Sequence, residues 1–175
     1  GGQIPSVLIK SILARACEFA TEPGHWYCDP LNNHDAIAGY LPMGEEIWTQ
    51  TEGRVDALVH VVGTAHSIHG VAAAIRAHGT ELQVTAVEPA ESAVLSGGPT
   101  GSNKIAGIGI GFVPPLWEPD QVDELQPVSA PDAMATARRL TREEGLLAGP
   151  SSGPHVVSAL QAAKHPRSLA AVVPV

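Results

Sequence analysis

The sequence predicts an α/β fold in which helices cover both faces of a parallel, twisted sheet. Segments 56–62 and 82–87 are short and almost continuously apolar, as expected for strands buried on both faces. Segments with apolar residues at helical spacing alternate with these runs. Small-residue turns follow at 63–67 and 149–153. This alternation favours parallel strands joined by crossover helices.

The first half of the chain predicts two helices before the first strand. Residues 7–20 have helical spacing and are expected to form the first helix. Residues 21–44 are rich in Pro, Gly, Asn and Asp and are expected to be mostly loop, with a short strand at 26–28. A brief helix is expected over 45–51, followed by a turn, the strand 56–62, and a helix over 67–77 that ends at Gly79.

The second half predicts strands, a long loop and two more helices. The strand 82–87 leads into a glycine-rich loop over 92–111. Ser129, with Asp132 three residues later, has the pattern of a helix N-cap, and the helix is expected to reach about Glu144. A short strand at 146–148, the turn 149–153, a helix over 155–163 and a last strand over 170–173 complete the prediction.

The composition excludes several classes of partner. A chain of 175 residues is long enough for one domain with a substantial core. Its ten Lys and Arg residues are scattered and its formal net charge is -8, so neither nucleic acid nor an anionic membrane is expected as a partner. No apolar run approaches the roughly 20 residues of a membrane span. Cys17 and Cys28 are expected to be reduced, buried thiols of a cytoplasmic protein.

The two small-residue turns are the candidate ligand site, because ligands of parallel sheets bind at the carboxyl ends of the strands. Gly63, Thr64 and Ser67 suit a phosphate held at a helix N-terminus. The turn is not a P-loop, because no lysine follows its glycine. It also departs from GxGxxG, because Ala65 stands where the second glycine would be.

Two other readings of these turns are less favoured. His60, His66 and His69 are close in sequence but lack a motif such as HExxH, so no metal site is predicted and they are interpreted as surface or supporting histidines. His155 is interpreted as a helix-start residue. Residues 149–153, GPSSG, match the nucleophile elbow GxSxG, which leaves a hydrolase with Ser151 as nucleophile as a weaker alternative.

Four motifs together resemble a known family. VDALVHVVGTAHSIHGV, VTAVEPAESAVLSGG, KIAGIGIGFVP and EEGLLAGPSSG are similar, in order and spacing, to the second half of the cysteine synthase family. These are pyridoxal 5'-phosphate (PLP) enzymes of the tryptophan-synthase-β fold type. The resemblance extends from about residue 7 to residue 175. It implies PLP as cofactor, a small amino acid as substrate and a homodimer in the complete enzyme. It also implies that residues 1–175 are the C-terminal portion of such an enzyme, truncated at both ends.

The resemblance assigns roles to particular residues. The phosphate-binding turn of the family corresponds to Gly63, Thr64, Ala65, His66 and Ser67. The serine beside the pyridine nitrogen corresponds to Ser151, and the substrate-proximal positions correspond to Gly107, Ile108 and Asp29.

Two positions depart from the family pattern. Ala65 and His66 replace two glycines of the usual Gly-Thr-Gly-Gly-Thr turn, and a non-glycine residue at positive φ would cost about 1 kcal/mol or more. Either the geometry of the turn differs from that of the family, or His66 adds a hydrogen bond to the phosphate. Asp29 stands where the family often has a glutamine near the substrate carboxylate, which an acid would repel.

The activity implied by the resemblance is β-replacement or β-elimination on a substrate such as O-acetylserine or cysteine. This chemistry needs a Schiff-base lysine. Lys10, Lys104 and Lys164 do not occupy its position, so no catalytic residue is assigned and the chain alone is expected to be inactive. The alternatives are a cysteine desulfhydrase-type lyase and a non-catalytic remnant that binds PLP or phosphate.

Overall fold

The computed structural model describes residues 6–164 and 171–173. Within them, four parallel strands form one sheet in the order β3-β2-β1-β4. The strands are β1 (Ala57–Val61), β2 (Gln83–Pro89), β3 (Glu124–Val128) and β4 (Ala171–Val172). The register of β1 against β2 runs from Ala57 beside Gln83 to Val61 beside Val87. The predicted parallel sheet is confirmed.

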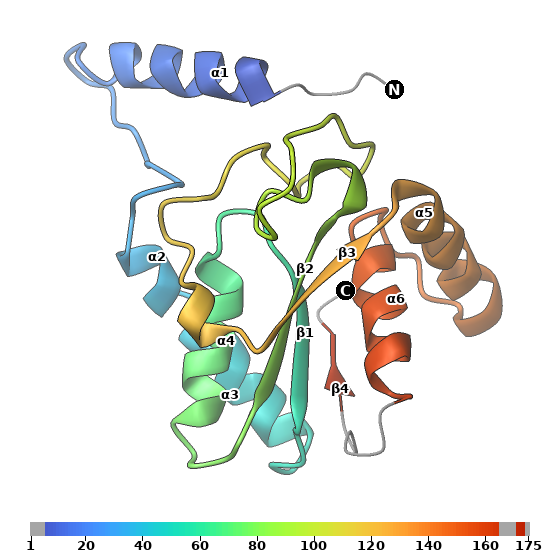
Figure 1. The fold of residues 1–175 in the computed structure, drawn as a ribbon. Coiled ribbons are helices and arrows are strands. Elements are labelled where there is room, and N and C mark those ends of the chain that lie inside the picture. The colour runs from blue at the N-terminus through green and yellow to red at the C-terminus, as the bar shows by residue number, and fades with distance from the viewer. Residues whose placement is uncertain (1–5, 165–170, 174–175) are drawn as a thin grey trace.

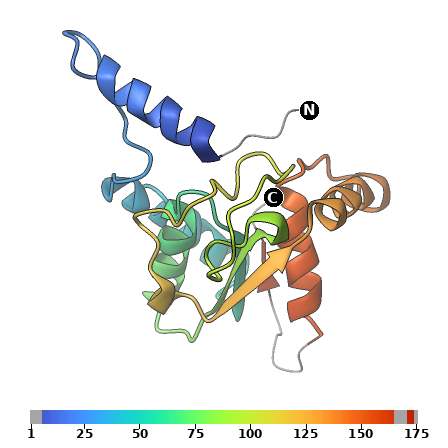
Figure 2. The ribbon, with the colours of Figure 1, turned by 45° about the horizontal axis from the view of Figure 1, so that its top comes forward.

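Helices cover both faces of this sheet (Figures 1 and 2). The helices α3 (Leu41–Gln50) and α4 (His66–Arg76) lie on one side, and α5 (Ala130–Arg139) and α6 (Ser152–Ala162) lie on the other. Leu58 of β1 packs into the core beneath α3 and α4, whereas Val59 and Val61 pack into the core beneath α5 and α6. Successive side chains of β1 therefore point to opposite faces of the sheet and pack into two different hydrophobic cores.

The helix α1 and the two ends of α5 can be compared with the sequence prediction. The helix α1 (Ser6–Phe19) agrees with the prediction and lies apart from the sheet, joined through a loop to α2 (Asp35–Ala38) (Figure 1). Ser129 caps α5 by accepting a hydrogen bond from Asp132 N, as predicted, and α5 continues as a π-helical turn over Leu140–Glu144. No helix in the described ranges is both long and apolar enough to cross a bilayer.

Two predicted strands are wrong. Residues 26–28 and 146–148 have no sheet partner, and Trp26 and Leu147 are 82% and 92% exposed. Each segment satisfied a local pattern of apolar residues, but neither lies against the sheet. The expected burial of Cys17 and Cys28 is also wrong, because both thiols are exposed on segments outside the two cores.

The sequence did not predict the strand β3, and it placed the first residues of α3 and α6 too late in the chain. The edge strand β3 contains Pro127 and is only partly buried, so it lacks the apolar run of a central strand. α3 begins at Leu41, four residues before the expected start, because Pro42 is tolerated in a first helical turn. α6 begins at Ser152, three residues early. Residue 170 of the last predicted strand lies outside the described residues.

Close packing of α6 against α5 fixes the turn at 149–153. A Cβ added at Gly153 would lie 1.9 Å from the carbonyl oxygen of Ala133, and this is backbone that a rotamer change cannot move. A Cβ added at Gly149 would meet only Ser151 Oγ, at 3.9 Å.

Gly153→Ala is therefore expected to lower the free energy of unfolding by about 2 kcal/mol or more, although alanine has the higher helix propensity. Urea unfolding of the full-length natural protein measures this loss, with Gly149→Ala as the matched variant. Equal stabilities of the two variants would contradict the packing argument.

Candidate functional site

A cavity of about 370 Å³ lies at the carboxyl end of β1. Three segments line it: the end of β1 with the turn after it, the glycine-rich loop, and the start of α6. The lining residues are His60, Val61, Gly63, Thr64 and Ser67 from the first segment, Gly107, Ile108 and Ile110 from the second, and Ser151, Ser152 and His155 from the third. The volume falls within the range of small-molecule sites.

Six of the sequence-predicted site residues meet in this cavity: Gly63, Thr64, Ser67, Gly107, Ile108 and Ser151. Ala65 and His66 belong to the same turn, but their side chains are buried and do not line the cavity. Asp29 does not line it either. Its carboxylate accepts hydrogen bonds from Leu31 N and from the backbone and side chain of Asn32.

The turn 63–67 leaves backbone donors free at the start of α4. The first helical bond of α4 runs from His69 N to Ala65 O, so the amides of residues 66–68 have no acceptor within the helix. No side chain caps this end. Free amides and the helix dipole favour an anion at such a terminus.

Ala65 takes the left-handed conformation that this turn requires, with φ 72° and ψ -5°. The cost foreseen for a non-glycine residue at positive φ therefore applies to Ala65, but not to His66, which is the first residue of α4. The methyl group of Ala65 is buried in the core beneath α3 and α4, which offsets part of the cost.

His66 packs behind the turn. Its Nδ1 lies 2.9 Å from Thr64 Oγ1, whereas its Nε2 is buried with no hydrogen-bond partner. The imidazole therefore holds the side chain of Thr64, which itself faces the cavity.

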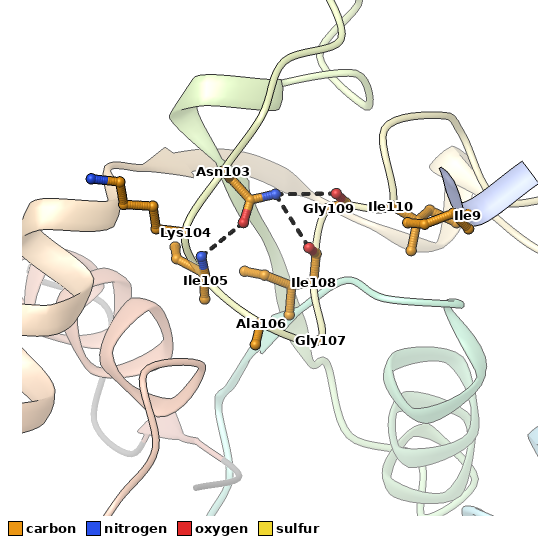
Figure 3. A pocket seen from close by; sticks show the side chains of 9 residues that line it. All are labelled: Ile9, Asn103, Lys104, Ile105, Ala106, Gly107, Ile108, Gly109 and Ile110. Carbon is orange, nitrogen blue, oxygen red and sulfur yellow. Dashed lines mark hydrogen bonds between the residues drawn. The ribbon is translucent and has the colours of Figure 1, made fainter. Parts of the chain in front are cut away.

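The glycine-rich loop forms the second wall, close to the end of β1. A Cβ added at Gly63 would lie 3.1 Å from Gly107 O, and Gly109 N donates to Val62 O at 3.4 Å. Asn103 shapes the loop by accepting from Ile105 N at 2.8 Å and donating to Gly109 O at 3.2 Å (Figure 3).

A second cavity, of about 180 Å³, lies along residues 103–110 of this loop and reaches Ile9 of α1 (Figure 3). The side chain of Lys104 borders it and points away from the other lining residues (Figure 3). Lys10 Nζ lies 5.7 Å from the centre of the Phe112 ring, and Lys164 is exposed after α6. None of these three lysines lines the 370 Å³ cavity.

Two histidines of the cavity were not recognised from the sequence. His60 and His155 are buried, with ring centres 5.2 Å apart in an edge-to-face arrangement. Interpreting His60, His66 and His69 as surface residues was wrong in that respect, because all three are buried. His60 lies within a strand that is buried on both faces, and this placement was the available signal.

Burial keeps this histidine pair neutral. Burial lowers the pKa of His60, while the hydrogen bond to Val61 O opposes that shift. Burial first, and then the neighbouring His60, lower the pKa of His155 to about 4. Among the described residues, no group of three or more His, Cys, Asp or Glu side chains is arranged to hold a metal ion.

Comparison with known proteins defines the class of this site. The profile of the family described as pyridoxal-phosphate dependent enzyme matches residues 7–175. The chain belongs to this family, whose cofactor is pyridoxal phosphate.

Within the family, the chain is similar to several cysteine synthases. The chain is 42% identical over 137 residues to cysteine synthase 3 of Caenorhabditis elegans, covering 78% of the chain and 41% of the relative. It is 45% identical over 130 residues to the cysteine synthase of Haemophilus influenzae, covering 70% and 41%. The cysteine synthase structure from Entamoeba histolytica superposes with a TM-score of 0.82 at 34% identity, covering 91% of this chain and 46% of the other. The chain thus spans about half the length of the relatives it matches.

The left-handed conformation of Ala65 yields a stability prediction. Ala65→Gly and Ala72→Gly each remove a methyl group from an alanine that is 2% exposed, but only the first also relieves a positive φ. Ala65→Gly is expected to cost at least about 1 kcal/mol less than Ala72→Gly. Urea unfolding of both variants measures the difference, and equal costs would contradict strain at Ala65.

The low pKa of His155 yields a pH prediction. An unfolded imidazole has a pKa of about 6.5, so as pH falls the unfolded chain binds the proton first. The stability contributed by neutral His155 is fully present above about pH 6.5. It is lost as pH falls to about 4, where the folded protein also binds the proton.

The free energy of unfolding is expected to drop by roughly 3 kcal/mol across this interval through His155. The drop should be smaller in His155→Asn, which cannot titrate. Urea unfolding at several pH values between about 4 and 7 compares the two proteins, and parallel curves would refute the assignment.

Proposed function

We propose that this chain forms part of a PLP-dependent enzyme of the cysteine synthase type, which catalyses β-replacement or β-elimination on a small amino acid. The observation that carries the proposal is one cavity shared by the uncapped start of α4 and by Ser151. The complete enzyme is proposed to be a cytoplasmic homodimer whose remaining portion supplies the Schiff-base lysine. Relatives of about twice the matched length support a larger protein.

The residues of the cavity fit the phosphate of PLP. The amides of residues 66–68 lack helical acceptors, and the hydroxyls of Thr64 and Ser67 face the same space. In the tautomer with hydrogen on His66 Nδ1, the imidazole donates to Thr64 Oγ1 and leaves the hydroxyl proton of Thr64 for the phosphate. His66 thereby orients a phosphate donor without touching the ligand.

Ser151 fits the pyridine end of the cofactor. Its hydroxyl makes no capping bond to α6 and faces the cavity. Bound PLP supplies an electron sink for negative charge at the substrate Cα. A neutral serine beside the ring nitrogen, in place of an aspartate, does not hold that nitrogen protonated, so the sink is milder and suits β-substitution and β-elimination. Gly107 and Ile108 would lie beside the substrate.

The contacts of His155 do not support the hydrolase alternative. His155 is the histidine one helical turn from Ser151, and both of its ring nitrogens are engaged by backbone groups, Ser151 O and Val61 N. Neither nitrogen is bonded to the hydroxyl of Ser151, so this residue is not arranged as an activated nucleophile.

The test is PLP binding by the full-length natural protein, followed by absorbance. Ser67→Ala and Ser151→Ala are each expected to raise the Kd for PLP by about five-fold, the effect of one lost hydrogen bond. Thr49→Ala removes an exposed hydroxyl on α3, far from the cavity, and should leave the Kd unchanged. A wild-type protein that does not bind PLP would refute the proposal.

The products separate the two activities. O-acetylserine and sulfide yield cysteine and acetate in the synthase reaction, whereas cysteine and water yield pyruvate, ammonia and hydrogen sulfide in the lyase reaction. PLP binding with neither set of products would favour the non-catalytic alternative.

A further inference from the structure

One imidazole joins two walls of the cavity. His155 Nδ1 lies 3.0 Å from Ser151 O, and Val61 N lies 3.1 Å from His155 Nε2. Because a carbonyl oxygen only accepts and an amide N–H only donates, the hydrogen resides on Nδ1 and the lone pair on Nε2. The ring therefore uses both nitrogens, one towards each wall.

The amide of Val61, at the end of β1, has a side chain as its partner. Within the residues that the structure describes, β4 pairs with β1 at Ala57 and Leu58. In the described part of the chain, the acceptor for the buried Val61 amide is the side chain of His155. Without that acceptor the amide would be buried and unsatisfied, which costs more than a hydrogen bond gains.

We propose that His155 is a positioning residue, which fixes the spacing between the phosphate-binding turn 63–67 and the turn that carries Ser151. Val61 precedes Gly63 by two residues, and Ser151 is the residue whose carbonyl the imidazole holds. This inference rests on the proposed function, because the spacing matters only for a ligand that contacts both turns.

The surroundings of His155 keep its bonding pattern intact. The side chain is 6% exposed, and its ring lies 5.2 Å, centre to centre, from the ring of His60, which is also buried. His60 holds its own hydrogen on Nδ1, bonded to Val61 O at 2.7 Å. Both rings are therefore neutral and oriented by the same residue of β1.

Two substitutions of His155 can each keep one of its two hydrogen bonds and remove the other. An asparagine places its amide nitrogen near the position of Nδ1 and can keep the bond to Ser151 O, but it does not reach Val61. A glutamine places its oxygen near Nε2 and can accept from Val61 N, but it loses the donor to Ser151 O. Only the imidazole makes both contacts, with Val61 N at the end of β1 and with Ser151 O. Ser158→Ala is the matched control, because Ser158 is fully buried on the same helix and its hydroxyl has no partner.

The test compares two probes on the full-length natural protein: PLP, which contacts both turns, and inorganic phosphate, which contacts only the turn 63–67. PLP binding is followed by absorbance and phosphate binding by phosphorus NMR. Both His155→Asn and His155→Gln are expected to raise the Kd for PLP by about five-fold or more, while the Kd for phosphate stays within about two-fold of wild type. Ser158→Ala should change neither.

The other outcomes overturn the inference in distinguishable ways. PLP affinity equal to wild type in both His155 variants would show that the spacing does not depend on the imidazole. Equal weakening of PLP and phosphate would indicate a general structural role. Absence of PLP binding by the wild-type protein would refute the proposed function, and this inference with it.

Discussion

The strand β1 lies between two hydrophobic cores, and all five of its residues are buried. Leu58 contributes to one core and Val59 and Val61 to the other, so a shift of one residue would exchange the two sets of contacts. This constraint fixes the point at which the strand ends. Because Gly63 and the turn after it follow directly, their place is set by the packing of the strand rather than by any contact with a ligand.

All three walls of the cavity are attached to the last residues of this strand. Val62 O accepts from Gly109 N of the glycine-rich loop, and Val61 N donates to His155 of α6. The turn 63–67 continues the strand itself. The cavity is therefore built on a strand whose five residues are all buried, which provides a rigid support for lining groups that are individually small and neutral.

The fold class and the place of the turn 63–67 beside the cavity could be predicted from the sequence because both depend on local patterns. Continuous apolar runs identified β1 and β2, and Gly63 marked the turn. The edge strand β3 could not be found in this way, since Pro127 and partial burial remove the apolar run. The roles of His60 and His155 depend on contacts between residues 94 positions apart, as in the bond from Val61 to His155. No local pattern contains such information.

The absence of cationic side chains among the described lining residues determines how the binding of an anionic ligand would depend on ionic strength. No lysine or arginine is among the described residues that line the cavity, so amide dipoles and hydroxyls, rather than cations, would face an anion. Dissolved salt screens interactions between exposed charges, and has little effect on short contacts with buried dipoles. The chain as a whole carries a formal charge of -8 and repels anions at long range. Added salt would therefore speed the capture of an anionic ligand while leaving its rate of release almost unchanged.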